Sequence, residues 1–282
     1  MKIGIAGLGL IGGSMAKAYR VYSEENGAGF EIYGYDIDKT ILDFSILSGV
    51  LDGALDSETA GRCDVVFVAL YPKDTEEYMR QISPCLSREC VLMDLCGIKA
   101  GVCRLGFELA EKYGFLFVGG HPMAGTQYSG YKHSRATLFK GAPMVIVPPR
   151  YDDIALLDRI KKILTPAGFG HYSITSADEH DRMIAFTSQL AHVVSNAYVK
   201  SPTAVNHKGF SAGSYKDMTR VAWLNEKMWT ELFLENKEHL LFELDTIISS
   251  LSEYRDALKN EEKEKMESLL RAGRVAKENI DK

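Results

Sequence analysis

The histidine at position 121 has the surroundings of a group that could move a proton. It stands inside the run GGHPMAG, residues 119–125, directly after the apolar residues 115–118. The apolar run predicts a buried strand, and the glycines predict a turn. A side chain after such a turn lies at the carboxyl edge of a sheet, where open α/β sheets bind ligands. His121 is therefore a candidate catalytic base, although a structural histidine bonded to the backbone fits the position equally well.

Two cations, Lys216 and Arg220, stand four residues apart in the run GSYKDMTR, residues 213–220. The pattern Ser214-x-x-Asp217 predicts a helix start after two glycines, and the spacing puts both cations on one helix face. Cations near a helix N-terminus predict an anion site, in which arginine can hold a carboxylate bidentately. The alternative is a solvated face on which Asp217 pairs with Arg220. The glycines that precede the predicted helix favour the anion site.

The elements that must position these groups begin with a nucleotide fingerprint. Residues 3–6 form an apolar strand, the sequence GLGLIGG follows at 7–13, and residues 14–22 have a helical pattern. This is the G-x-G-x-x-G arrangement in its required order of strand, turn and helix, with phosphate expected at the helix N-terminus. A second strand, residues 31–35, ends at Asp36, whose carboxylate can accept from a ribose hydroxyl and repels a 2′-phosphate. The pattern predicts NAD rather than NADP.

Strands and helices continue to alternate as far as residue 174. Apolar strands are predicted at 65–70, 90–93, 115–118, 144–147 and 169–174, with helices at 76–82, 100–113 and 154–164. This α/β alternation is typical of a doubly wound, mostly parallel sheet of the Rossmann type. Three strand ends, at Tyr71, Asp94 and His121, would then face one crevice. The residues predicted to bind the cofactor there are Gly7, Leu8, Gly9, Leu10, Ile11, Gly12, Asp36, Leu70, Tyr71, Asp94, Cys96 and Gly97.

The composition changes near residue 176. Ser176 and Glu179 form a capping box at the start of a helix that runs to about residue 198 and contains His192 among apolar residues. His192 can be a core histidine or a site residue, and the pattern does not choose between them. Later apolar periodicity predicts more helices, the last of them exposed and amphipathic. We expect an NAD-binding domain at 1–174 and an all-α domain at 175–282 that binds substrate and forms a homodimer.

The whole-chain composition narrows the class of protein. With 282 residues and a net charge of -5, the chain is a poor partner for nucleic acid, which needs a basic face. No apolar run approaches the roughly 18–20 residues of a membrane span, and no signal peptide precedes the first strand, so we expect a cytoplasmic protein. The five cysteines lack metal-ligand spacing, which favours reduced thiols and no metal site.

Several motifs, taken in order, resemble those of the prephenate dehydrogenases, the TyrA proteins of tyrosine biosynthesis. The GHPMAG and KDMTR segments are specific to that family, whereas the nucleotide fingerprint alone is not. The resemblance covers nearly the whole chain. Its carriers are GLGLIGGS at 7–14, DLCGIK at 94–99, GHPMAGT at 120–126, EHD at 179–181, SQLAH at 188–192 and KDMTR at 216–220.

The resemblance implies an NAD-dependent oxidative decarboxylation of prephenate to 4-hydroxyphenylpyruvate. Hydride leaves the ring carbon that bears the hydroxyl, carbon dioxide is lost, and the ring becomes aromatic. Neutral His121 would accept the hydroxyl proton. Arg220 would bind a substrate carboxylate, with Lys216 as a second cation. His192 would be a second active-site histidine with a positional role, and Thr126 and Gln127 would line the substrate end of the pocket.

One position departs from the family pattern. Many members have serine in a D-x-x-S-x-K pattern, placed to hydrogen-bond near the reacting hydroxyl, where this chain has Gly97. The departure leaves open what orients His121, with Thr126, Ser129 or a water as candidates.

The sequence leaves three alternative functions. An arogenate dehydrogenase would need an acceptor, preferably a carboxylate, near the amine of its substrate. A dehydrogenase of 6-phosphogluconate-like or imine-reductase-like architecture commonly relies on lysine or aspartate, and the histidine of GHPMAG argues against it. A dimer that senses NAD without turnover is disfavoured by the polar groups at three strand ends.

Overall fold

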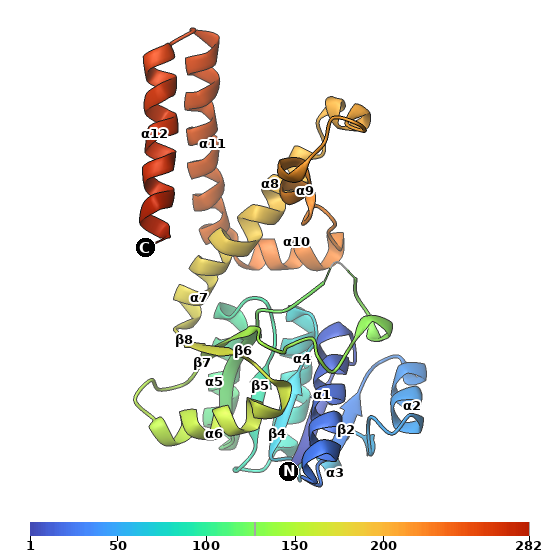
Figure 1. Ribbon diagram of the computed structural model, residues 1–282. Helices are drawn as coiled ribbons and strands as arrows, with labels where there is room; N and C mark the ends of the chain where they lie inside the picture. Colours follow the sequence, from blue (N-terminus) through green and yellow to red (C-terminus); the bar gives the residue numbers. More distant parts are fainter. Residues whose placement is uncertain (127, 282) are drawn as a thin grey trace.

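The computed structural model describes residues 1–126 and 128–281, and its first part is built on one eight-stranded sheet (Figure 1). The strands are β1 (Lys2–Ala6), β2 (Glu31–Tyr35), β3 (Gly53–Ala54), β4 (Val65–Val68), β5 (Val91–Asp94), β6 (Leu116–Pro122), β7 (Pro143–Val147) and β8 (His171–Ile174). Their order is β3-β2-β1-β4-β5-β6-β7-β8, and only β6 and β7 pair antiparallel. The predicted doubly wound, mostly parallel sheet is confirmed.

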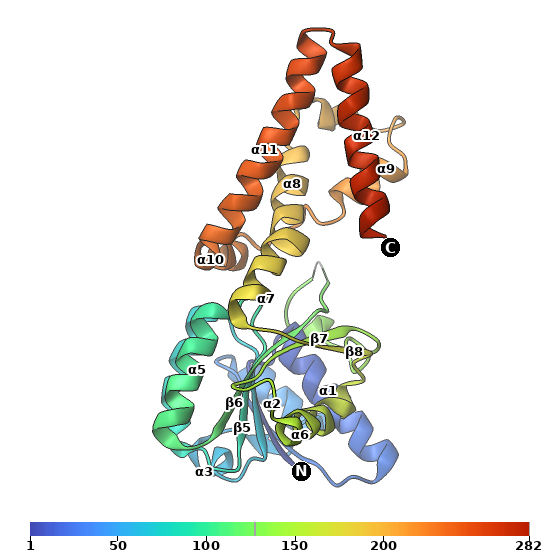
Figure 2. The ribbon, with the colours of Figure 1, turned by 90° about the vertical axis from the view of Figure 1, so that its left-hand side faces the viewer.

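Helices cover both faces of this sheet. They are α1 (Leu10–Asn26), α2 (Lys39–Leu47), α3 (Ser57–Ala60), α4 (Pro72–Ile82), α5 (Ala100–Tyr113) and α6 (Ile154–Leu164). Because successive side chains of a strand point to opposite faces, Ile3, Ile5 and Phe67 pack with α1, α2 and α6, whereas Val66 and Val68 pack with α3, α4 and α5. Figure 2 shows α5 on one side of the sheet and α1 with α6 on the other.

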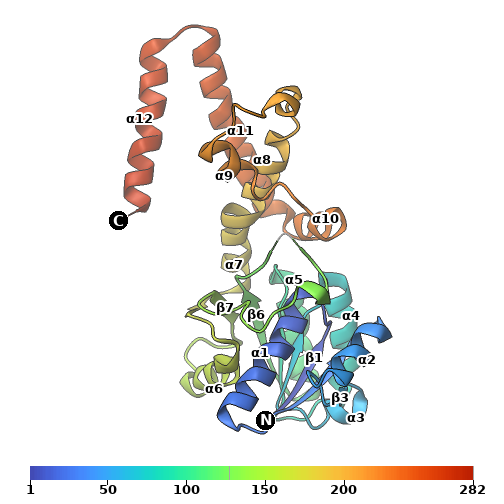
Figure 3. The ribbon, with the colours of Figure 1, turned by 45° about the vertical axis from the view of Figure 1, so that its right-hand side comes forward.

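The rest of the chain is helical and projects from one edge of the sheet, with α7 leading out of it (Figure 3). The elements are α7 (Ala177–Ile184), a π-helical segment (Ala185–Leu190), α8 (Ala191–Tyr198), α9 (Gly213–Thr219), α10 (Glu226–Glu235), α11 (Lys237–Lys259) and α12 (Lys263–Ile280). Short 3₁₀ turns occupy Ser83–Cys85, Tyr131–His133, Thr165–Ala167 and Pro202–Asn206. None of the helices in the described residues is long and apolar enough to cross a bilayer.

The predicted helix after Ser176 corresponds to α7, the π-helical segment and α8, which follow one another without a break. Ser176 caps this helix as expected, because its hydroxyl accepts from the N–H of Glu179 at 3.1 Å. The carboxylate of Glu179 instead pairs with Arg182, so the reciprocal half of the capping box is not made. The last predicted helix, expected to be exposed and amphipathic, is α12, which forms a hairpin with α11.

The predicted turn at Gly119 and Gly120 is wrong. Both glycines, and His121 after them, continue strand β6 and pair with β7. Their neighbours leave no room for a side chain. An added Cβ would lie 2.5 Å from the Cys103 sulfur at Gly119, and 2.8 Å from the Asp94 carbonyl oxygen at Gly120. The glycines therefore serve close packing, and His121 is fixed by a paired strand rather than by a turn.

Candidate active site

Glycines shape the loop between β1 and α1. Gly7 has a φ of +85°, a conformation that favours glycine, and an added Cβ there would lie 2.5 Å from the Ala69 carbonyl oxygen. At Gly12 an added Cβ would lie 1.8 Å from the Gly7 carbonyl oxygen, so only glycine lets α1 pack so closely on the loop. Gly9 differs, because nothing lies within 4 Å of its added Cβ. The loop is therefore open at Gly9, where a diphosphate can approach the backbone.

The N-terminus of α1 is suited to an anion. Its N-cap is Gly9, its first turn has no acidic residue, and no side chain in the described part of the chain caps it. Beside it, the Asp36 carboxylate accepts from the N–H of Leu8 at 2.8 Å and from the N–H of Asp38 at 2.9 Å. Asp36 therefore braces the glycine loop, and it remains partly exposed at the end of β2, where a ribose would bind.

The other predicted cofactor residues lie along the carboxyl ends of the central strands. Leu8 is fully buried, and Leu10 and Ile11 are partly buried in the first turn of α1. Strand β4 ends two residues earlier than predicted, so that Leu70 and Tyr71 stand beyond it. Tyr71 is the N-cap of α4 and is 44% exposed. Of these residues, Tyr71 offers the most surface to a bound molecule.

A buried ion pair lies beneath the loop that follows β5. Asp94 and Lys99 are both fully buried and bonded to each other. Asp94 also accepts from the N–H of Cys96 at 3.0 Å and of Gly120 at 3.3 Å, so it ties the loop to β6. Burial has the largest single effect and opposes the charge of Lys99, but Asp94, Cys96 and Cys103 together outweigh it, so the pKa of Lys99 is raised. The Asp94 carboxylate points into the protein, so any contact of this residue with a cofactor must come from its backbone.

The neighbouring thiol of Cys96 also points inward. Its sulfur lies 3.2 Å from the hydroxyl of Thr75, and the residue is 3% exposed. Burial raises the pKa of Cys96 to about 12, so the group is a neutral thiol. Cys96 therefore contributes packing beneath the loop rather than a reactive group.

The imidazole of His121 lies between this loop and α7. Its Nδ1 is 2.8 Å from Nε2 of His180, and the two rings meet edge to face. Its Nε2 is on the side of Gly97, 3.9 Å from the point that a Cβ at residue 97 would occupy. Burial lowers the pKa of His121 well below 6.5, and the neighbouring His180 and Lys99 lower it further. His121 is therefore neutral at neutral pH.

His180 is held in turn by Asp181. The Nδ1 of His180 lies 2.7 Å from Oδ1 of Asp181, and the carboxylate also accepts from the N–H of Lys99 at 2.7 Å and of Ala100 at 2.8 Å. His180 is 3% exposed and Asp181 is 2% exposed. Burial lowers the pKa of His180 despite the opposite effect of Asp181. The two residues link α7, the start of α5 and His121.

The space above Gly97 is bounded by α10. An added Cβ at Gly97 would lie 3.5 Å from a methyl carbon of Leu232, which places this helix across the carboxyl ends of the strands (Figures 1 and 3). Two further hydrogen bonds fix α10 here. Asn236 donates to the Asp181 carbonyl oxygen at 2.8 Å, and Glu231 accepts from the N–H of Lys73 at 2.7 Å. The helical part of the chain therefore closes one side of the site.

The other predicted partners of His121 are placed differently. The hydroxyl of Thr126 donates to the Tyr128 carbonyl oxygen at 3.0 Å and is exposed. In the described part of the chain, no hydrogen bond joins Thr126 or Ser129 to His121, whose ring is held at Nδ1 by His180. Gln127 lies outside the described residues.

The placement of His192 agrees with both predictions, a core histidine and a site residue. Its Nδ1 donates to the Ser188 carbonyl oxygen at 2.8 Å, so its Nε2 remains an acceptor. Its ring lies 4.0 Å from the Trp229 ring, centroid to centroid. Burial lowers the pKa of His192, and the nearby charge of Arg220 adds to this effect. His192 is thus a partly buried, backbone-bonded histidine next to the predicted carboxylate-binding arginine.

The predicted helix start at Ser214 is wrong. Helix α9 begins at Gly213 with Ala212 as its N-cap, so Ser214 already lies inside the first turn and its hydroxyl does not cap. Arg220 is the C-cap, and its N–H donates to the Lys216 carbonyl oxygen at 3.0 Å. Both cations are exposed near the C-terminus of the helix, where they complement its dipole. An N-terminal anion site does not form here, and any carboxylate must bind to the side chains themselves.

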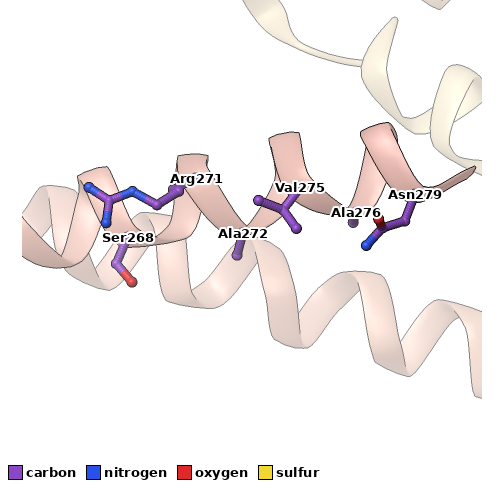
Figure 4. Close-up of a pocket in the computed structure, with 6 residues that line it drawn as sticks. All are labelled: Ser268, Arg271, Ala272, Val275, Ala276 and Asn279. Atoms are coloured by element: carbon purple, nitrogen blue, oxygen red, sulfur yellow. The ribbon is translucent and has the colours of Figure 1, made fainter. Parts of the chain in front are cut away.

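A surface hollow on α12 does not belong to this site (Figure 4). Its walls come from α12 alone, far along the sequence from the strand ends and from His121. In the described residues no group of three or more histidine, cysteine, aspartate or glutamate side chains could hold a metal ion. The residues that line the hollow are Ser268, Arg271, Ala272, Val275, Ala276 and Asn279.

The family model for the prephenate dehydrogenase nucleotide-binding domain matches residues 21–171, which is more than half of the chain. The chain belongs to the prephenate dehydrogenase family. The dimerization domain of the same family matches residues 176–272. These matches favour a dehydrogenase of this family over the 6-phosphogluconate-like architecture.

Relatives of the chain match it over almost its whole length. It is 29% identical to the prephenate dehydrogenase of Bacillus subtilis (strain 168), over 98% of this chain and 74% of the relative. It is 26% identical to the cyclohexadienyl dehydrogenase of Zymomonas mobilis, over 92% and 89%. The crystal structure of A. aeolicus prephenate dehydrogenase with hydroxyphenyl propionate and NAD+ has a TM-score of 0.82 at 27% identity, and covers 99% of this chain and 98% of that one.

The sequence predicts no separate role for His180, although this residue stands in the EHD run at 179–181 that resembles the prephenate dehydrogenases. His180 and His121 are 59 residues apart and lie in different halves of the chain. The only sequence pattern that points to His180 is a histidine next to an aspartate in the first turns of a capped, amphipathic helix. That pattern does not say which strand end the helix meets.

Proposed function

We propose that this protein catalyses the NAD-dependent oxidative decarboxylation of prephenate to 4-hydroxyphenylpyruvate. The observation that carries the proposal is the placement of His121 at the carboxyl edge of a nucleotide-type sheet, with Nδ1 bonded to His180 and Nε2 on the side of Gly97. Burial lowers the pKa of His121 well below 6.5, so its imidazole is neutral. A neutral imidazole can accept the hydroxyl proton of an alcohol as it is oxidised. Membership of the prephenate dehydrogenase family supports the reaction class.

The residues of the glycine loop fit NAD. Gly9 leaves space for the diphosphate, the uncapped N-terminus of α1 suits its charge, and Asp36 suits a ribose hydroxyl while repelling a 2′-phosphate. The complex of the A. aeolicus relative with NAD+ supports the same choice. Bound there, the nicotinamide would supply the hydride acceptor for the ring carbon that bears the hydroxyl.

His121 performs both proton steps in this proposal. It accepts the 4-hydroxyl proton at Nε2 while hydride leaves the same carbon. The ring carboxylate then departs as carbon dioxide, and the electron pair of the broken bond makes the ring aromatic. The proton returns from His121 to the phenol oxygen, so the base is regenerated without net uptake or release of a proton from the hydroxyl.

Cationic and polar groups of the helical part would orient the substrate. Arg220 would bind one carboxylate, with Lys216 as a second cation and His192 offering its free Nε2. Thr126, which follows β6, and its sequence neighbour Gln127 would line the substrate end of the pocket. Trp229, which stacks on His192, adds an apolar wall for the ring.

Arogenate is the second candidate substrate. The name of the Zymomonas relative, a cyclohexadienyl dehydrogenase, supports a substrate class broader than prephenate. The carboxylate of Asp181, on α7, already accepts from His180 and two backbone N–H groups, so it is a poor acceptor for the arogenate amine. Prephenate is therefore the favoured substrate.

The test is an absorbance assay with each substrate and each cofactor. With prephenate and NAD we expect NADH and 4-hydroxyphenylpyruvate in equal amounts, and much weaker activity with NADP because of Asp36. Turnover of arogenate without turnover of prephenate would identify arogenate as the substrate. No turnover of either would refute the proposal.

Replacing Arg220 with alanine should raise KM for prephenate about ten- to a hundredfold, with a smaller change in kcat, because a charge-assisted hydrogen bond to a carboxylate is lost. Lys216→Ala should have the same direction and a smaller size. Arg150→Ala is the matched control, since Arg150 is an exposed arginine that pairs with nearby Asp152. An unchanged KM in Arg220→Ala would remove this residue from the carboxylate site.

A homodimer through the helical part is the proposed assembly. Helix α12 has no buried residue in the described chain, and large apolar side chains are exposed along the α11–α12 hairpin. Such a surface is typical of an interface, and the dimerization domain of the family matches this region. The exposed apolar residues of the hairpin are Leu241, Phe242, Ile248, Leu251, Leu258, Leu270, Val275 and Ile280.

Light scattering after size exclusion should give about twice the chain mass of 31.3 kDa. Leu251→Glu should shift the protein toward monomer, because it places a charge in the apolar interface. Leu47→Glu changes an even more exposed leucine, on α2, and should leave the mass at the dimer value. A wild-type protein that elutes as a monomer would contradict the proposed assembly.

A further inference from the structure

We propose that His180, backed by Asp181, sets the tautomer of His121 and so keeps its Nε2 ready to accept a proton. The inference deepens the proposed function, on which it rests, by naming the positioning residues of the base. It also answers what orients His121 in this chain, because an imidazole from α7 holds the ring at Nδ1, the nitrogen that faces away from Gly97. His180 touches no substrate in this account and acts only through His121.

The argument begins at Asp181, whose carboxylate is 2% exposed and surrounded by donors. Its Oδ2 accepts from the N–H of Ala100, and its Oδ1 from the N–H of Lys99. Both N–H groups belong to the N-terminus of α5, which has no side-chain cap of its own and favours a negative charge. With N–H donors on both oxygens, Asp181 acts as an acceptor toward His180.

An acceptor at Asp181 fixes the protons of both imidazoles. The Nδ1 of His180 lies 2.7 Å from Asp181 Oδ1, so Nδ1 must carry the hydrogen. In a neutral imidazole, the other nitrogen is then an acceptor. The Nε2 of His180 therefore accepts from Nδ1–H of His121, at 2.8 Å. Nδ1 of His121 is protonated, and its Nε2, on the side of Gly97, has the free lone pair.

The opposite arrangement is disfavoured by the charges around the pair. If His180 were protonated on both nitrogens, it would donate to Nδ1 of His121, and the free hydrogen of His121 would move to Nε2. Burial lowers the pKa of His180, and the buried ammonium of Lys99 also disfavours a positive charge there, although Asp181 and Asp94 oppose these effects. His180 is 3% exposed, so no water surface compensates such a charge.

The same contacts connect the base to the docking of the helical part. Asp181 is fixed through its carboxylate to the start of α5 and through its carbonyl oxygen to Asn236, next to α10. The tautomer of His121 in β6 is therefore correct only when α7 is seated against the sheet. The arrangement resembles the logic of a histidine oriented by a carboxylate, with a second imidazole between them.

The experiment compares His180→Leu, which removes the acceptor, with His180→Gln, whose amide can donate to Asp181 and accept from His121. Nitrogen–proton correlation spectra of the full chain labelled with 15N-histidine report the tautomer of each ring, and His121→Asn assigns the signal. We expect protonated Nδ1 at His121 in wild type and His180→Gln, and loss of that single tautomer in His180→Leu. His171→Leu, at an exposed histidine of β8, is the control.

Steady-state rates complete the test. His180→Leu should lower kcat about a hundredfold, the lower end of a general-base contribution, and His180→Gln should recover it to within about tenfold of wild type. The inference is overturned if wild-type His121 carries its proton on Nε2, or if His180→Leu leaves the His121 tautomer unchanged. The spectra need no substrate, so wild-type protein that turns over neither prephenate nor arogenate would refute the proposed function alone.

Discussion

Replacing His121 with asparagine should lower kcat for prephenate oxidation about 10²–10⁴-fold, the usual contribution of a general base. Asparagine keeps a polar group in β6 but cannot accept a proton at the position of Nε2. The KM for NAD should change little, because the glycine loop and Asp36 lie on other elements. The measurement is steady-state NADH formation with saturating cofactor, accompanied by a thermal melt to confirm folding.

His171→Asn provides the matched control for this substitution. His171 is an exposed histidine on β8, at the far edge of the same sheet, and its replacement should leave kcat at the wild-type value. A folded His121→Asn protein that keeps wild-type kcat at neutral pH would show that the proton leaves the hydroxyl by another route.

The second large effect concerns stability. Lys99→Met should lower the free energy of unfolding by about 3–5 kcal/mol, because it leaves the fully buried carboxylate of Asp94 without its cation. The Asp94 carboxylate also accepts from the N–H groups of Cys96 and Gly120. The unpaired charge should therefore also destabilise the loop beside His121. Chemical denaturation followed by circular dichroism measures the change.

Two further variants separate charge imbalance from lost packing. The double variant Asp94→Asn with Lys99→Met removes both charges but keeps an acceptor for the backbone, and should recover much of the lost stability. Lys162→Met makes the same substitution in an exposed pair with Asp158 and should have little effect. If Lys99→Met unfolds at the wild-type denaturant concentration, the buried pair does not stabilise the loop.

Seven of the eight strands could be predicted from sequence because each has a local signal, whereas the two-residue strand β3 has none and was not predicted. Apolar runs of four to six residues mark the strands, and the order glycine loop, helix, strand, Asp36 has a strict spacing. The glycines at 119 and 120 predict a turn because a glycine pair is typical of turns. In the structure they are required by close packing against Cys103 and Asp94 within a strand. That contact joins elements far apart in the chain.

The helical part was harder to predict in detail. Its helices are periodic and their existence follows from the pattern, but the start of α9 depends on Gly213 and Ala212, which give a weaker signal than the S-x-x-D pattern beside them. His121 and the nucleotide loop were found because each lies in a local motif. The partner of His121 comes from α7, and only the packing of α7 on α5 brings them together.

The acid side of the pH profile of kcat/KM is the most direct test of the claim that a neutral His121 is the base. Because burial and its neighbours lower the pKa of His121 below 6.5, the reactive neutral form persists as the pH falls through 6.5. We predict that kcat/KM for prephenate with NAD stays level down to pH 6.5, falls only at lower pH, and loses this fall in His121→Asn. A midpoint at or above pH 6.5, or an unchanged fall in the variant, would contradict the account.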